Sequence, residues 1–157
     1  MRPTYERGIG LIEAVIASAI MVLVTLGIVA AQAYLVRSTS TATDLIQAQY
    51  LLEEGFEAIR LIRDNDWATI EGLSNNVAYT LSFNGAVWSA TTTMGIINNR
   101  FDRRVTLYPV YRDSSSRDIA ESGTLDPLTR RIEVSIAWFD RSATSTRTGT
   151  TYLTDLF

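Results

Sequence analysis

The chain contains no cysteine, histidine or lysine, so its 14 basic residues are all arginine. Without cysteine or histidine it cannot form a disulfide, an iron–sulfur site, a structural zinc site built from those ligands or a Ser-His-Asp triad. Without lysine it lacks a Schiff-base nucleophile and the lysine of a phosphate-binding loop. These absences exclude several of the commonest catalytic and metal-binding centres.

The chain also lacks a concentrated positive charge. Its net charge is -3, its pI is near 4.9 and its arginines are dispersed, so we expect no direct binding of nucleic acid. Its 157 residues suffice for one compact domain and an extended element. Hydrophobic residues make up 46% of the chain but crowd into its first quarter.

The remaining polar side chains form no recognisable reaction centre. No spacing of carboxylates singles out an acid and base pair, so we expect no enzymatic activity, no catalytic residue and no cofactor. Four acids lie close in sequence, at Asp113, Asp118, Glu121 and Asp126. Because they lack the regular alternation and the glycine of a calcium loop, we expect solvated acids and no metal site.

The N-terminal residues have the charge layout of an export or insertion signal. Arg2 and Arg7 precede an apolar segment, which favours a cytoplasmic N-terminus. No charge occurs from Ala14 to Val36, about 23 residues, close to the ~20 that a helix needs to cross a bilayer. We predict a single-pass anchor in the inner membrane with the rest of the chain extracytoplasmic. Secretory cleavage near Ala19 is disfavoured, because the apolar run continues beyond it.

Glu13 is the exception within this apolar segment. A carboxylate at the centre of a membrane helix costs on the order of 2.5 to 3.5 kcal/mol on insertion scales. Such a residue indicates a function and a positively charged partner.

The residues from Gly8 to Val15 resemble the prepilin motif of type IV pilin-like proteins. The resemblance implies that a prepilin peptidase cleaves between Gly8 and Ile9 and methylates the new amine of Ile9. Glu13 is then the fifth residue of the mature chain, and an assembly residue. Ile9 replaces the usual Phe, and cleavage after Gly10 would break the spacing to Glu13, so we favour Gly8.

Cleavage supplies the charge that Glu13 needs. The new ammonium at Ile9 stays positive after methylation, and a buried carboxylate is tolerated when such a cation is near. In a fibre the cation could belong to a neighbouring subunit. The alternative is a simple anchor whose Glu13 lies among the headgroups, ~6 Å of helix rise from Ile9.

A second helical pattern follows the membrane segment. Apolar residues recur every three or four positions and predict one buried stripe. They are Leu45, Ala48, Leu52, Phe56, Ile59 and Ile62. No proline occurs between Ile9 and Asp64, so we predict one helix of about 55 residues.

Charged residues of this second half are expected to form a solvated face. They are Glu53, Glu54, Glu57, Arg60, Arg63 and Asp64. Residues 38–43 have weak helix propensity, so we expect a bend or a melted turn there, with Asp44 capping a second segment. Gly55 is a second weak point.

The C-terminal part has the period-two pattern of an antiparallel sheet. Strands at 77–83 and 86–90 flank Asn84-Gly85, which suits a two-residue hairpin turn. A third strand runs from about 103 to 111, where Pro109 predicts an edge or a bulge. Apolar residues alternate in the clearest strand, 131–139, and should face the helix stripe: Ile132, Val134, Ile136 and Trp138. The last strand is expected near 146–153, and 112–129 is predicted to be a surface loop, or alternatively a recognition loop.

Two further stretches resemble minor pilins of the pilus-modification type. They run from Leu52 to Asp64, with Trp67 after it, and from Thr151 to Asp155. The resemblance implies a minor pilin whose partners are the prepilin peptidase, other pilin subunits, the pilus assembly platform and membrane lipid. It would reach the cell surface in an assembled pilus.

These observations predict an α+β fold in four segments. A leader occupies residues 1–8, the membrane and assembly half of a long helix 9–36, its amphipathic half 37–66, and an antiparallel sheet head 67–157. The expected function is that of a non-covalently assembled structural subunit of a type IV pilus. A type II secretion pseudopilin and a membrane-anchored binding domain that never polymerises remain alternatives.

Overall fold

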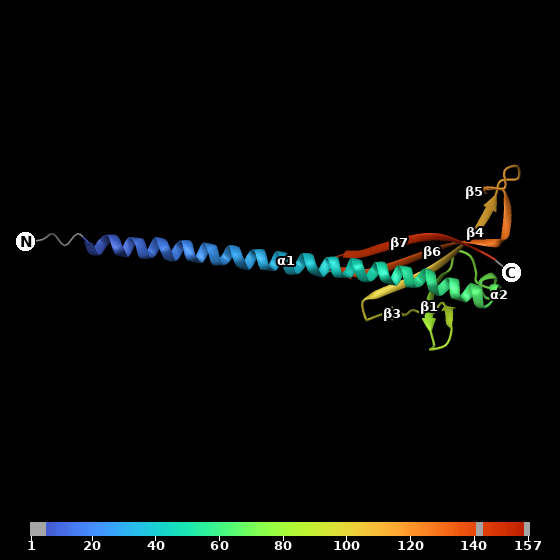
Figure 1. Ribbon diagram of the computed structural model, residues 1–157, viewed down its shortest axis with the longest axis horizontal. Coiled ribbons are helices and arrows are strands. Elements are labelled where there is room, and N and C mark those ends of the chain that lie inside the picture. Colours follow the sequence, from blue (N-terminus) through green and yellow to red (C-terminus); the bar gives the residue numbers. More distant parts are fainter. Residues whose placement is uncertain (1–5, 141–142, 156–157) are drawn as a thin grey trace, which may run out of the picture. The chain divides into compact units, whose positions relative to one another are not determined.

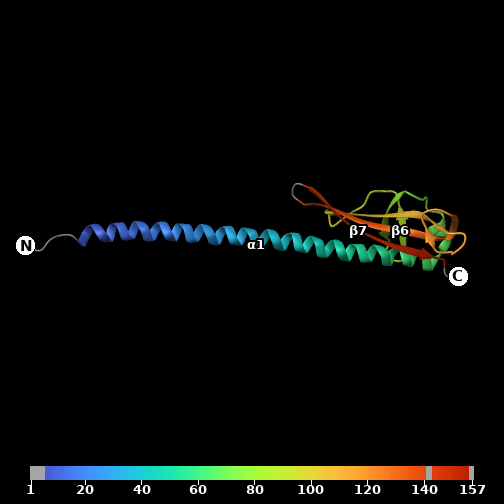
Figure 2. The same cartoon turned by 90° about the horizontal axis from the view of Figure 1, so that it is seen from above.

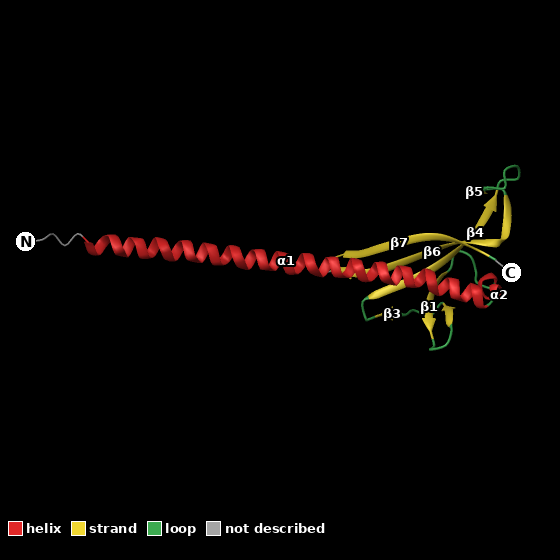
Figure 3. Ribbon diagram, viewed as in Figure 1, coloured by secondary structure: helices red, strands yellow, loops and turns green. Residues whose placement is uncertain are grey.

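The computed structural model describes residues 6–140 and 143–155, with side chains for 10–139 and 143–155. Within these ranges the chain forms helices and strands in the order shown in Figure 1 and coloured by type in Figure 3. They are α1 (Glu6–Asn65), α2 (Trp67–Glu71), β1 (Ala78–Phe83), β2 (Trp88–Thr91), β3 (Ile96–Ile97), β4 (Phe101–Arg112), β5 (Ile119–Ala120), β6 (Thr124–Asp140) and β7 (Ala143–Thr154). The predicted α+β class is confirmed. The chain divides into two compact units, Met1–Asp44 and Leu45–Phe157.

The first unit is helical wherever it is described. The melted turn predicted at 38–43 does not form, and Asp44 lies inside α1 instead of capping a new helix. The hydroxyls of Thr39, Thr41 and Thr43 donate to carbonyl oxygens four residues earlier, at 2.9 to 3.3 Å. These bonds satisfy the polar side chains within the helix, so weak propensity alone does not break it.

The second unit is a seven-stranded antiparallel sheet against which the last part of α1 packs. The main strand order is β2-β1-β4-β6-β7, and the short strands β3 and β5 also pair with β4. Figure 2 shows this part of α1 on one side of the strands. Within the described residues, no helix covers the opposite face of the sheet.

The predicted hairpin is formed by β1 and β2, but its turn differs from the prediction. Phe83 pairs with Trp88, so four residues separate the last paired positions. The side-chain oxygen of Asn84 accepts hydrogen bonds from the backbone amides of Ala86 and Val87, at 3.0 and 2.9 Å. Of the four turn residues only Gly85 has a positive φ, of 94°, so the predicted two-residue turn at Asn84-Gly85 is wrong.

The third and fourth predicted strands correspond to β4 and β6. The register of β4 and β6 shifts between Pro109 and Val110, which confirms the predicted bulge. Pro109 pairs with Arg130, whereas Val110 pairs with Asp126, so three residues of β6 are left over at the shift.

The predicted loop at 112–129 is therefore wrong in part. Beyond the bulge, residues 110–112 pair with 124–126, and the end of β4 also pairs with β5. Only 113–118 and 121–123 lie outside strands. Asp126 and Pro127 are typical turn residues, yet both lie within β6, because the bulge accommodates them there. The sequence alone does not show the extent of this bulge.

The core lies between α1 and the sheet. The inward positions of β6 are all buried, as predicted, and so are the corresponding positions of β4. On the helix Ala48, Leu52, Ile59 and Ile62 are buried, but Leu45 is 46% exposed. Leu45 is wrong as a stripe residue because Asp44, four positions before Ala48, takes the buried position instead and is 5% exposed.

Glycine allows a close approach of the helix to the sheet. A Cβ atom on Gly55 would lie 2.8 Å from Cγ1 of buried Val134 and 3.3 Å from Cδ of Arg103. On the sheet side, a Cβ atom on Gly149 would lie 3.1 Å from the side chains of Leu52 and Phe56. The prediction that Gly55 is a weak point of the helix is therefore wrong. Gly55 is a position where the helix packs closely against the sheet.

We predict that Gly55→Ala destabilises the sheet unit by about 1 kcal/mol. Forcing Val134 aside costs about 1 to 3 kcal/mol, and the gain in helix propensity returns at most about 1. Thermal unfolding of the full chain in detergent, followed by near-UV circular dichroism, measures the change. Gly27→Ala is the control, since a Cβ atom there meets nothing within 4 Å. An unchanged or higher midpoint for Gly55→Ala would contradict the close approach.

Candidate functional site

The predicted processing and assembly residues lie in the first turns of α1. Gly8 and Ile9 are within the helix, and their side chains lie outside the described ones. The Glu13 side chain is exposed and makes no hydrogen bond or ion pair to any residue that the structure describes. Ile9 and Glu13 are four residues apart, a little over one helical turn. Within the described part of the chain, nothing neutralises the Glu13 carboxylate.

The helix around Glu13 exposes apolar side chains in every direction. Between residues 11 and 36, fifteen large hydrophobic side chains are each more than half exposed. They are Leu11, Ile12, Val15, Ile16, Ile20, Met21, Val22, Leu23, Val24, Leu26, Ile28, Val29, Tyr34, Leu35 and Val36. This helix is long and apolar enough to cross a membrane, with the sheet unit after it.

Hydroxyl groups in this segment are satisfied inside the helix. Ser18 donates to the carbonyl oxygen of Val15 at 2.8 Å, and Thr25 donates to that of Met21 at 2.7 Å. Such internal bonds allow polar side chains in lipid. Glu13 has no comparable bond to a described residue, which distinguishes it from these hydroxyls.

A buried arginine joins the helix to the sheet. Arg103, on the inward face of β4, is 3% exposed, and its Nη1 lies 3.1 Å from the Glu54 carboxylate of α1. Its guanidinium also lies 5.4 Å from the ring centre of Trp88. Burial lowers the pKa of Arg103, and Glu54 opposes that shift. Glu54 was predicted to be only part of a solvated face. It is also the counter-ion of the buried Arg103.

The signal for this arginine is present in the sequence. Arg103 precedes Val105 and Leu107 at the same two-residue spacing, which places all three on one face of the strand. An arginine at an inward position requires hydrogen-bond acceptors around it, and a carboxylate from the covering element also compensates its charge. Sequence alone does not identify Glu54 as that carboxylate.

Two of the four acids between 113 and 126, Asp113 and Asp126, accept hydrogen bonds from neighbouring residues. The Asp113 carboxylate accepts hydrogen bonds from the backbone amides of Ser115 and Ser116, at 2.8 and 2.9 Å, and bonds from Ser115 and Ser116 lower its pKa to about 2. Asp126 accepts a bond from Nε of Arg112 at 2.6 Å, and this bond lowers the pKa of Asp126. Among the described residues no cluster of acids is arranged to hold a metal ion. The Asp113 bonds order the turn at 113–118.

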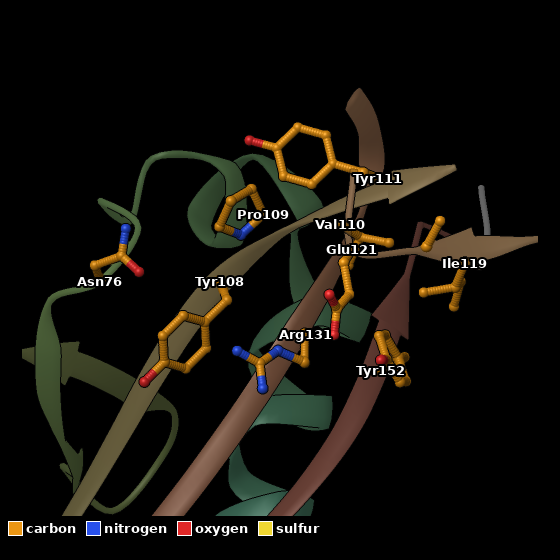
Figure 4. A pocket seen from close by; sticks show the side chains of 10 residues that line it. Asn76, Tyr108, Pro109, Val110, Tyr111, Ile119, Glu121, Arg131 and Tyr152 are labelled. Carbon is orange, nitrogen blue, oxygen red and sulfur yellow. The ribbon is translucent and has the colours of Figure 1, made fainter. Parts of the chain in front are cut away.

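A hollow of about 660 Å³ lies on the sheet face opposite the helix (Figure 4). Tyr108 of β4 pairs with Arg131 of β6, which pairs with Tyr152 of β7, so the three form one row across the sheet. The guanidinium carbon of Arg131 lies 4.2 Å from the centre of the Tyr108 ring. Tyr111 and Glu121 line the same hollow. Sequence reasoning missed this hollow, because the row depends on strand register.

Comparisons with protein-family models, curated proteins and solved structures find no match to this chain.

We predict that Glu54→Gln destabilises the sheet unit by about 1 to 2 kcal/mol. Loss of one partner leaves the buried Arg103 charge uncompensated, and the penalty is reduced because the Glu54 side chain is 47% exposed. Unfolding of the full chain by urea in detergent measures the change. Glu53→Gln is the control, an exposed acid that bonds Gln49 on the helix surface. Glu54→Gln combined with Arg103→Met should recover much of the loss, and no recovery would contradict the pairing.

Proposed function

We propose that this chain is a structural subunit of a type IV pilus or a related pseudopilus, of the minor pilin kind. The observation that carries the proposal is Glu13, a carboxylate without a partner among the described residues, on a helix whose surface is otherwise apolar. It stands five residues after Gly8, as in the prepilin motif. The observed α+β fold, a helix packed against an antiparallel sheet, agrees with this proposal.

The proposed role of Glu13 follows from electrostatics. Cleavage after Gly8 by the prepilin peptidase creates an ammonium group at Ile9, and methylation keeps it positive. Among packed helices, where the dielectric is low, an unpaired carboxylate is costly, and a nearby cation offsets that cost. A neighbouring subunit's N-terminus placed against Glu13 therefore selects one axial position for each incoming subunit.

The apolar surface of the same helix serves in both states of the subunit. Before assembly, side chains from Leu11 to Val36 contact lipid, with the N-terminus inside and the sheet unit outside the inner membrane. On assembly at the platform, the same side chains exchange lipid for the helices of other subunits. Because lipid and helix surfaces are similarly apolar, the exchange is nearly balanced, and the charge pair at Glu13 provides direction.

In this proposal the sheet unit is displayed on the assembled pilus and performs no catalysis. Assembly is non-covalent, since the chain has no lysine for an isopeptide bond. An anchor that never polymerises, or a pseudopilin of a secretion system, would share the same helix. Processing and fibre incorporation separate these possibilities.

Processing is tested by mass spectrometry of the mature N-terminus, from cells with and without the prepilin peptidase. We expect a methylated Ile9 as the first residue when the peptidase is present, and the unprocessed chain when it is absent. Gly8→Ala should block processing, whereas Gly10→Ala should leave the start at Ile9. A mature chain that begins at Met1, or anywhere other than Ile9, would sink the proposal.

Assembly is tested with Glu13→Ala. The variant should insert into the membrane and be cleaved, because it gains apolar character, but its amount in sheared fibres should fall at least about tenfold, since it lacks the charge pair. Quantitative immunoblotting of fibres and membranes gives the ratio. Glu53→Ala, which removes an exposed acid from the second half of α1, is the control. Normal incorporation of Glu13→Ala would count against the charge pairing.

A further inference from the structure

The hollow beside Arg131 holds two charges that the described part of the chain does not neutralise. The side chain of Arg131 makes no hydrogen bond or ion pair within the described residues, and its guanidinium rests against the Tyr108 ring. Glu121 lines the same hollow and likewise has no partner within that part of the chain. The two groups also do not pair with each other. A bound molecule could therefore satisfy both.

Stacking holds the guanidinium in a defined orientation. A guanidinium above an aromatic ring keeps its N–H groups directed outward around its edge. Arginine has five such donors in a planar fork, which matches the two oxygens of a carboxylate. The donor set of Arg131 is thus ordered before any ligand arrives, which lowers the entropy cost of binding.

The remaining lining suits a ring with hydroxyl groups. Tyr108 and Tyr152 flank Arg131 in the row across the sheet, and Tyr111 stands at the upper side of the hollow in Figure 4. Tyrosine offers a flat apolar face and a polar hydroxyl, which complement the C–H face and the hydroxyl rim of a sugar ring. Glu121 also lines the hollow and is an acceptor for sugar hydroxyls.

We propose that this hollow binds an acidic saccharide, of the uronic acid class. The sugar carboxylate accepts hydrogen bonds from Arg131, its ring packs against the tyrosine faces, and its hydroxyls donate to Glu121. A volume of about 660 Å³ accommodates two or three sugar rings and lies within the usual range of ligand sites.

Other ligand classes match the hollow less well. A neutral sugar leaves Arg131 without an anion. An organic cation would need the face of the Tyr108 ring, which the positively charged guanidinium of Arg131 already covers. The site lies wholly within the sheet unit, so this proposal does not depend on cleavage at Gly8 or on fibre assembly. Its failure would leave the proposed structural role intact.

The test is binding of tri-galacturonate to the full chain in detergent, measured by calorimetry. The fully methyl-esterified trisaccharide is the matched ligand control, since it keeps the rings but lacks the charges. We expect the acid to bind at least about tenfold more tightly than the ester, because only the acid forms charge-assisted bonds to Arg131. Equal affinity of acid and ester, or no measurable binding of either, would overturn the proposal.

Variants assign the binding to the hollow. Arg131→Gln should weaken binding of the acid at least about tenfold. The affinity of Arg131→Lys should lie between those of the unchanged chain and Arg131→Gln, since lysine keeps the charge but not the planar fork of donors. Tyr152→Leu should weaken it about fivefold, because the flat ring is lost. Arg147→Gln is the control, an exposed arginine of β7 outside the hollow. Circular dichroism establishes that each variant folds, and unchanged affinity in folded Arg131→Gln or Tyr152→Leu would contradict the site.

Discussion

The distance between α1 and the sheet is set by the contact of Gly55 with Val134, and most of the second unit depends on it. Without a side chain at Gly55, the helix backbone lies close enough for its apolar stripe to meet the inward residues of β4 and β6. Arg103 passes beside this contact to reach Glu54 at the helix surface. A larger separation would admit water to the buried guanidinium and loosen the core together.

The two parts of α1 differ in how their apolar residues are distributed. In Leu45–Asn65 the buried apolar residues form one stripe against the sheet, and the exposed remainder carries the charged residues together with a few apolar ones, such as Ile46 and Leu61. In the segment from Leu11 to Val36 apolar residues occupy all sides, and Ser18 and Thr25 bond within the helix. The contrast matches a difference in solvent, because the first segment is long and apolar enough to cross a membrane. Water favours a polar face, whereas lipid requires that backbone and side-chain polar groups be satisfied locally.

Sequence predicted most of the fold because the relevant signals are periodic. Alternation in β6 indicated the buried residues directly, and Pro109 indicated the position of the bulge. Features that depend on pairing between distant residues could not be predicted in this way. The partner of Arg103, the row formed by Tyr108 and Arg131, and the strand after the bulge all require the register. The shifted hairpin turn had a local cause, since the Asn84 side chain replaces a backbone acceptor.

The same distinction between local signals and distant pairing applies to the candidate functional residues. Gly8, Ile9 and Glu13 are close in sequence, so a motif can identify them without a structure. The hollow is assembled from β4, β6, β7 and the turn that carries Glu121, and no local pattern marks it. Where a site is built from several strands, composition shows only that arginine, tyrosine and acid are present.

The bulge between Pro109 and Val110 separates the sheet into a part with a fixed register and an appended part. Residues 101–109 pair with 130–138 in one register, and the three extra residues at 127–129 separate this pairing from that of 110–112 with 124–126. Residues 110–126 therefore form a separate segment beyond the bulge, with its own strand pairing. Val110, Tyr111 and Glu121 of this segment line the hollow, so a change in the length of the segment would alter one rim of the hollow and leave the pairing of residues 101–109 with 130–138 in place.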